Sequence, residues 1–161
     1  MVAARGQLIQ SLPPGAMLAV ALSEEAVQAW LTPELSLAVI NGVERCVVAG
    51  SDEAIDALQQ KLQLQGIETR VLQTSHAFHS HLLEPVLASF TQQLRQVQLY
   101  APTLPYLSNL TGTWISPELA TDPDYWVRHL RHTVRFADRV ISCSEREGPL
   151  GSTAGASATI R

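Results

Sequence analysis

Short apolar runs alternate with turn-forming and helix-capping residues along the first half of the chain. Four of these runs have the length and composition of buried strands: 16–22, 35–40, 45–49 and 68–72. Two stretches with helical spacing lie between them. One follows the capping residue Ser23, and the other follows Ser51 and places Ile55, Leu58 and Leu62 on one face. The resulting order, β-α-β-β-α-β, predicts a ferredoxin-like unit.

Turn signals and later helical patterns complete the expected order of elements. Asn41-Gly42 is a tight-turn pair, which predicts a hairpin between the second and third strands. The first 11 residues form a short amphipathic piece. An apolar stripe across 82–97 predicts a long helix, Asp122-Pro123 opens another, and a helical rhythm continues over 136–141.

Composition narrows the class of protein without naming a function. Of the 161 residues, 46% are hydrophobic and 16% are charged, an ordinary globular balance. The net charge of −4 spreads over the chain without a basic face, which argues against a nucleic-acid partner. No apolar run approaches the ~20 residues that span a bilayer, so no membrane partner is expected. Cys46 and Cys143 lack a CxxC pattern, which is typical of free thiols in a reducing cytosol and predicts a cytoplasmic protein.

Three of the five histidines, His76, His79 and His81, lie within six positions, directly before the 82–97 stripe. Three interpretations compete for them. A metal site lacks further ligands nearby, so none is predicted. A structural role, capping the following helix or bonding inside a core, is the ordinary one. A neutral imidazole can also act as a general base on a hydroxyl nucleophile, but the Gly-x-Ser-x-Gly elbow that would expose a serine is absent.

At the histidine segment, and over about residues 1–141 in all, the chain resembles the acyltransferase domain of modular type I polyketide synthases, the family of malonyl-CoA:acyl carrier protein transacylases. The similar segments, in chain order, are Arg5-Gly6, 13–17, 75–80, 82–87, 108–112, 125–131 and 134–138. That family inserts a ferredoxin-like subdomain into a large α/β-hydrolase-like subdomain. The resemblance therefore implies a fold of the α/β (α+β) class. It divides the chain into a remnant of the large subdomain, the ferredoxin-like subdomain, the C-terminal part of the large subdomain and a disordered tail: 1–15, 16–75, 76–141 and 142–161.

The resemblance also implies roles for four residues. His79 would be the catalytic base that activates a serine, which carries a malonyl group from malonyl-CoA to an acyl carrier protein. His76 and Phe78 would select malonyl, since Phe78 would crowd a 2-methyl group, and one methyl in a pocket changes binding by ~1–3 kcal/mol. Asn109 would line the same site. No bound cofactor is implied beyond malonyl-CoA as substrate.

The resemblance places three expected groups before Met1: the nucleophile elbow, the arginine that pairs with the malonyl carboxylate, and the oxyanion-hole glutamine. After 141 the composition changes abruptly, which suggests a frameshift or a broken gene end. We therefore expect a fragment that needs the missing remainder of the acyltransferase and is inactive alone. The alternative is a non-catalytic module that binds a carrier protein, or a relic without function.

Overall fold

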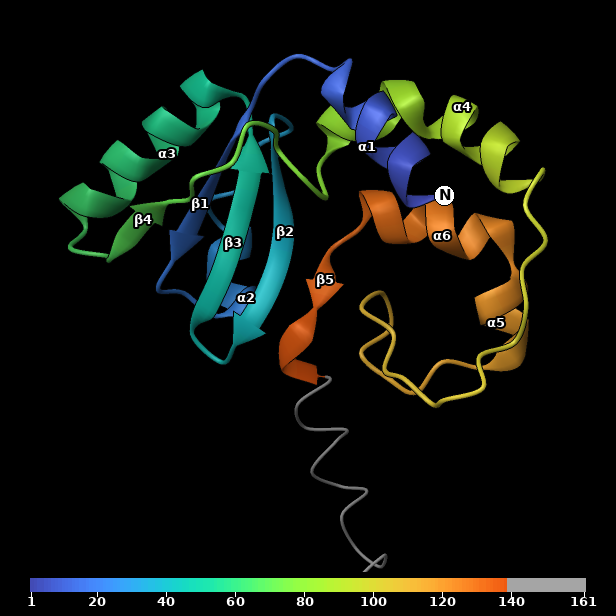
Figure 1. Ribbon diagram of the computed structural model, residues 1–161. Coiled ribbons are helices and arrows are strands. Elements are labelled where there is room, and N and C mark those ends of the chain that lie inside the picture. Colours follow the sequence, from blue (N-terminus) through green and yellow to red (C-terminus); the bar gives the residue numbers. More distant parts are fainter. Residues whose placement is uncertain (139–161) are drawn as a thin grey trace, which may run out of the picture.

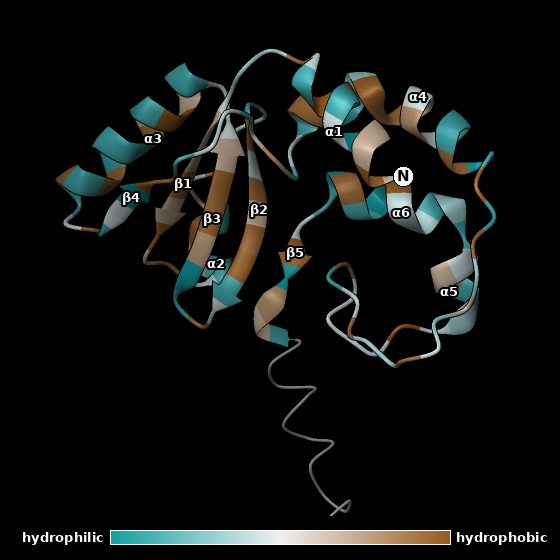
Figure 2. Cartoon of the chain, viewed as in Figure 1, coloured by the Kyte–Doolittle hydropathy of each residue, from teal (hydrophilic) through white to brown (hydrophobic). Residues whose placement is uncertain are grey.

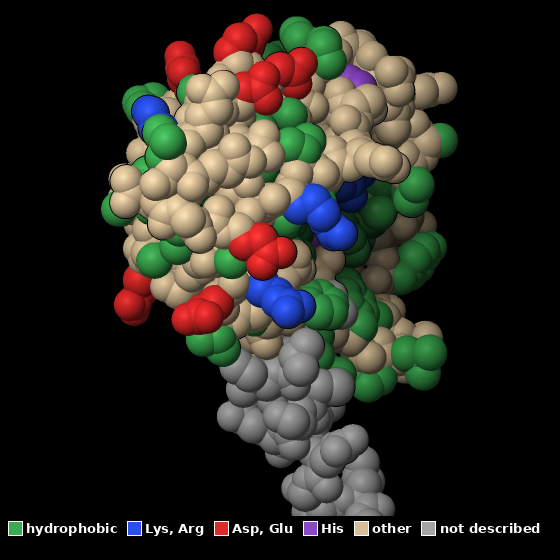
Figure 3. Space-filling model, turned by 90° about the vertical axis from the view of Figure 1, so that its left-hand side faces the viewer, with side chains coloured by type: hydrophobic (Ala, Val, Ile, Leu, Met, Phe, Trp, Pro, Cys, Tyr) green, Lys and Arg blue, Asp and Glu red, His purple; other side chains and the backbone are tan. Residues whose placement is uncertain are grey.

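The computed structural model describes residues 1–138, which form a sheet with two helices beside a group of further helices (Figure 1). The predicted disorder of 142–161 lies outside these residues, and the predicted helical stretch 136–141 runs beyond them. Every helix within residues 1–138 is too short or too polar to span a membrane. On the face shown in Figure 3, acidic and basic side chains lie scattered among uncharged ones.

The sheet confirms the ferredoxin-like prediction and adds one strand to it. Its strands run in the order β4-β1-β3-β2-β5. Strands β4, β1, β3 and β2 each pair antiparallel with the next in this order. Together with the two helices between them in sequence, they form the split βαβ arrangement. The fifth strand pairs parallel to β2 and was not predicted. The bounds are β1 Ala16–Val20, β2 Leu35–Gly42, β3 Arg45–Gly50, β4 Thr69–Val71 and β5 Val134–Arg135.

Helices α2, Glu24–Gln28, and α3, Asp52–Leu64, cover one face of the sheet. Both begin as expected, because the Ser23 and Ser51 hydroxyls accept hydrogen bonds from backbone amides three residues on, each at 3.2 Å. Helix α3 turns its apolar stripe inward, and the strands beneath it are largely apolar (Figure 2). The core between them contains these buried residues: Leu18, Val20, Val27, Val48, Ile55, Leu58 and Leu62.

The hairpin between β2 and β3 turns two residues later than predicted. Asn41 and Gly42 continue β2, with Gly42 opposite Arg45, and the turn falls on Val43 and Glu44. Neither Asn41 nor Gly42 takes the positive φ that made the pair a turn signal. The register shifts between Ile40 and Gly42, so an irregularity in the pairing displaces the turn and leaves Val43 87% exposed at its tip.

A second group of helices packs beside the sheet: α1 Val2–Gln10, α4 Glu84–Leu94, α5 Pro117–Thr121 and α6 Pro123–Arg131. The predicted 82–97 helix begins as a 3₁₀ turn, His81–Leu83, and its α-helical part ends at Leu94. Val97, predicted on the buried stripe, is 42% exposed because the chain has already left the helix. Helix α5 was not predicted, although Ser116 caps it and Pro117 occupies its first turn. These helices enclose a second apolar cluster built on Ile9, Leu83, Phe90, Leu94 and Leu130.

Candidate active site

The histidine segment crosses from the sheet to the helical group, and close packing against β1 fixes its start. The amide of Gly15 donates to the Ser75 carbonyl oxygen at 3.3 Å. A side chain at Gly15 would lie 2.9 Å from the Gly50 carbonyl oxygen and 3.0 Å from the Ala77 methyl carbon, so only glycine allows this approach. The buried Ser80 hydroxyl donates to the Ala77 carbonyl oxygen at 2.6 Å and tightens the segment.

Two of the three histidines hold this segment in place. His76 is 5% exposed, with Nδ1 2.8 Å from the Ser75 hydroxyl and Nε2 3.3 Å from the Leu12 carbonyl oxygen. His81 Nδ1 lies 3.2 Å from the Ser36 hydroxyl on β2, which also accepts the His81 amide hydrogen at 3.2 Å. Both imidazoles therefore have structural partners on distant segments.

His79 has a different environment. Its φ is +56°, the left-handed region that costs a side-chain-bearing residue free energy and that other contacts must maintain. Its Nδ1 lies 3.0 Å from the carbonyl oxygen of His132, the residue that ends α6. Because a carbonyl can only accept, Nδ1 carries the proton there and Nε2 presents its lone pair. An imidazole in this tautomer can take a proton at Nε2.

The charge balance around His79 keeps its ring neutral. Burial lowers its pKa to about 4 from an ordinary 6.5, with further lowering from the positive charges of Arg5 and His129. The carbonyl groups of His132 and His129 act in the opposite direction but do not outweigh burial. At neutral pH the imidazole is therefore unprotonated, the state that a general base requires.

Phe78, the residue before His79, and His129, whose ring contacts that of His79, line a cavity of about 390 Å³. The cavity is mostly apolar and within the usual size range of small-molecule sites. Arg5, half-buried on α1, supplies its charged side chain, and burial lowers the pKa of this guanidinium. His129 on α6 also lines the cavity and adds a polar imidazole ring. The lining residues are Met1, Val2, Arg5, Gly6, Ile9, Phe78, Phe90, Trp126 and His129.

Aromatic and polar side chains connect this cavity to the 108–112 loop. Tyr125, Trp126 and His129 lie on one side of α6, with the His129 ring centroid 6.2 Å from Tyr125 and 5.9 Å from Trp126. The buried Tyr125 hydroxyl donates to the Ser108 hydroxyl at 2.8 Å. The amide nitrogen of Asn109 lies 3.4 Å from His129 Nε2. The site thus combines a neutral base, a cation and an apolar cavity.

Comparison with known proteins assigns this arrangement to a family. Residues 1–151 match the family described as the acyl transferase domain. The chain belongs to the acyl transferase domain family. Its curated relatives include a subunit of the phenolphthiocerol/phthiocerol polyketide synthase of Mycobacterium tuberculosis, 41% identical over 161 residues, which covers 96% of this chain and 11% of that protein. Polyketide synthase GfsB of Streptomyces halstedii is 40% identical over 153 residues, which covers 92% of this chain and 3% of that protein.

Solved acyl transferase domains share the fold. The acyl transferase domain of SpnD in complex with 2-(pent-4-yn-1-yl)malonyl superposes with a TM-score of 0.86 at 43% identity, covering 92% of this chain and 36% of that one. The acyltransferase domain from the second module of the salinomycin polyketide synthase superposes with a TM-score of 0.85 at 42% identity, covering 90% of this chain and 34% of that one. This acyl transferase sequence therefore spans about a third of the solved domains and a small part of the synthases.

The structure separates the residues predicted for the site of this acyl transferase domain. Phe78 lines the cavity, whereas His79 does not line it and meets it through the His129 ring. Asn109 also reaches it through His129, and His76 contacts Phe78 with ring centroids 6.4 Å apart but is not part of the lining. Arg5 and His129 were missed as site residues. Both belong to segments that resemble the family, but no local pattern connects either one to His79. Among residues 1–138, no three His, Cys, Asp or Glu side chains gather as metal ligands.

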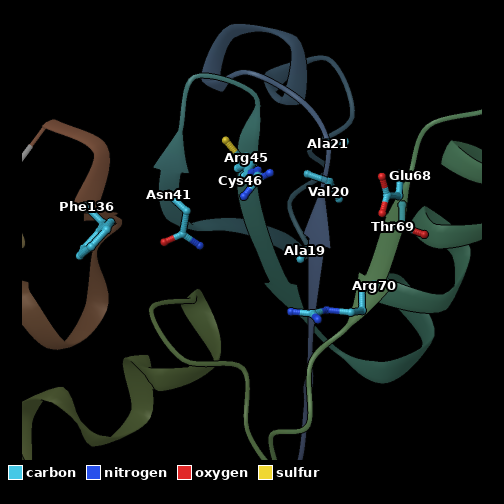
Figure 4. Close-up of a pocket in the computed structure, with 10 residues that line it drawn as sticks. All are labelled: Ala19, Val20, Ala21, Asn41, Arg45, Cys46, Glu68, Thr69, Arg70 and Phe136. Atoms are coloured by element: carbon cyan, nitrogen blue, oxygen red, sulfur yellow. The ribbon is translucent and has the colours of Figure 1, made fainter. Parts of the chain in front are cut away.

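A second hollow of about 560 Å³ lies against residues of β1 and β3 (Figure 4). Arg70 reaches it from β4, Glu68 from the chain just before β4, Arg45 from β3 and Phe136 from the chain after β5. Its lining mixes both charges and includes no imidazole. This hollow of the acyl transferase domain therefore differs from the cavity near His79, which His129 lines.

Proposed function

We propose that these residues are the base-bearing part of a polyketide synthase acyltransferase that moves a malonyl group from malonyl-CoA to an acyl carrier protein. The observation that carries the proposal is His79: a neutral imidazole held at Nδ1 by the His132 carbonyl oxygen, next to a cavity that carries a guanidinium. The similarity to polyketide synthases supports the reaction class.

His79 Nε2 would take the proton of a serine hydroxyl as the hydroxyl oxygen attacks the thioester carbonyl carbon of malonyl-CoA. The carbon–sulfur bond then breaks, and the imidazolium returns its proton to the departing CoA sulfur. In the second half, the same nitrogen takes a proton from the carrier protein's phosphopantetheine thiol. The thiolate attacks the serine ester, and the imidazolium returns its proton to the serine oxygen. The His132 carbonyl oxygen fixes the tautomer throughout and stabilises the imidazolium, as a carboxylate does in a triad.

Arg5 is the group we assign to the malonyl carboxylate. It is a half-buried cation on the cavity wall, and a guanidinium binds a carboxylate through two parallel hydrogen bonds. This assignment would supply the carboxylate partner from within the chain rather than from a segment before Met1. Phe78, on the same wall, narrows the space for a 2-methyl group and biases the site toward malonyl. His76 would act indirectly, through its ring contact with Phe78.

The 161 residues contain no Gly-x-Ser-x-Gly segment, so we propose that they form no acyl ester by themselves. The experiment compares the chain alone with a chimera in which the preceding part of the SpnD acyl transferase domain, 43% identical over the shared region, supplies the serine. Intact-mass spectrometry after malonyl-CoA treatment should show an acyl adduct on the chimera and none on the chain alone.

Variants of the chimera test the individual roles. H79N should reduce acylation by ~10³-fold or more, as the loss of a triad member does. R5A should weaken malonyl-CoA while changing the reaction of acetyl-CoA little, because acetyl has no carboxylate. Equal acylation of H79N and the parent chimera would refute the proposal. A chain that binds a carrier protein in a titration but never supports acyl transfer in the chimera would favour the non-catalytic module instead.

A further inference from the structure

Helix α6 acts on His79 through the carbonyl groups of His132 and His129 and through the His129 ring, and the proposed mechanism uses only one of these points. That point is the His132 carbonyl oxygen, 3.0 Å from Nδ1. Another is the His129 ring, whose centroid lies 6.2 Å from that of His79 with the rings at 78°, an edge-on contact. A hydrogen bond at one nitrogen fixes one point of an imidazole and leaves the ring free to rotate about that bond. A second ring packed edge-on against it removes this freedom.

Several contacts restrain the orientation of His129. Its ring packs against Trp126 and Tyr125 of its own helix, one turn earlier. The Asn109 amide nitrogen lies 3.4 Å from its Nε2, an arrangement in which Asn109 donates and Nε2 accepts. The Asn109 carbonyl oxygen in turn accepts the Arg135 amide hydrogen at 2.8 Å, which ties the loop to β5. The contacts therefore run from the sheet edge through Asn109 and His129 to His79.

We propose that His129 is a positioning residue for His79, holding the base by ring-edge contact while Asn109 holds His129. The proposal rests on the proposed function, since positioning matters only if His79 is the base. Besides His129, the charged group that faces His79 is Arg5 of α1. The carbonyl end of α6, which carries a partial negative charge, also faces His79.

The test uses the 161-residue chain with ¹⁵N-labelled histidine and needs no substrate. Long-range ¹H–¹⁵N correlations report the tautomer and titration midpoint of each imidazole, and the spectrum of H79N assigns the His79 signals. H129F keeps a ring of similar size but has no nitrogen atoms. We expect His79 in H129F to show mixed tautomers and a titration midpoint raised by about one pH unit, the size expected for removing a charge 6.2 Å away in partly screened surroundings.

Further variants separate positioning from charge and from folding. H129Q retains an acceptor for Asn109, so His79 should keep its single tautomer while its midpoint still rises. N109A should give mixed His79 tautomers as H129F does, and the double variant should add nothing to that effect of H129F, because both act through one contact. Y100F, at a side chain outside the site that is 72% exposed, is the control and should leave the His79 signals unchanged.

A merely structural His129 gives a different result. H129F and N109A would then lower the unfolding temperature while the remaining folded protein kept the parent His79 tautomer and midpoint, and that result would overturn the proposal. If H129F does not fold, N109A alone decides in the same way. Acyl transfer by the chimera is measured separately, so failure of the proposed function and failure of the positioning role are distinguishable.

Discussion

The low pKa of His79 makes the stability of the chain depend on pH in a way that one substitution removes. The pKa is about 4 in the folded chain and 6.5 ordinarily. Between these values the unfolded chain binds more protons than the folded chain, so the free energy of unfolding rises with pH. Stability is therefore complete above pH 6.5, is lost as the pH falls toward 4, and changes no further below 4 through this group.

The size of the effect follows from the shift. One pKa unit corresponds to about 1.4 kcal/mol, so the full effect of the shift from 6.5 to about 4 is at most about 3.5 kcal/mol. Lowering the pH from 7.5 to 5.0 should reduce the free energy of unfolding by at most about 2 kcal/mol through this group. Solvent screening of the partly exposed ring makes the reduction smaller.

The assay is urea unfolding of the 161-residue chain at pH 7.5 and 5.0, with H79N beside it. Asparagine suits this position because it tolerates positive φ and cannot titrate. H79N should lose up to about 2 kcal/mol less than the parent chain between the two pH values, while Y100F, at an exposed side chain, should behave like the parent. Equal losses in H79N and the parent chain would refute the inference that His79 is buried as a neutral base.

Three further substitutions test the packing around the site by urea unfolding. G15A should destabilise the chain by about 1–3 kcal/mol, because its methyl group would overlap the Gly50 carbonyl oxygen and Ala77, whereas G6A, with open space around its new carbon, should not. Y125F should cost about 1 kcal/mol through the buried bond to Ser108, and Y100F, at a side chain 72% exposed, should be neutral. E24Q should cost up to about 1 kcal/mol by breaking the paired hydrogen bonds from Arg135, and less at high salt, while E25Q in the same helical turn should have no such effect.

The ferredoxin-like unit could be predicted because its signals are local. Each long strand is an apolar run, and each helix has a serine cap and an inward stripe, so neighbouring residues suffice to identify it. The errors fall where distant contacts decide. Val134 and Arg135 form a strand only because β2 offers a parallel edge, and the paired hydrogen bonds from Arg135 to Glu24 help to hold them there. Asn41-Gly42 reads as a turn until its pairing with β3 is known.

The candidate site was predictable in part for the same reason. His79 and Phe78 stand in one compact motif, so the resemblance located them. Arg5 and His129 reach the cavity from the first and sixth helices, and nothing in the residues around either one indicates that it faces an imidazole. His76 and His81 share the motif with His79, yet their nitrogens contact Ser75, Leu12 and Ser36. Sequence alone could not assign these three histidines to different roles.

The position of His79 depends on both halves of the fold. Its left-handed backbone needs support, and that support comes from distant segments on either side: Ala77 packs against Gly15 at the start of β1, and His81 bonds to Ser36 on β2. The His132 carbonyl oxygen at the end of α6 completes it. Because these contacts converge on one loop, loosening either the sheet or the helical group must relax the same backbone. A base held in this way is correctly oriented only when the sheet and the helices are folded against each other.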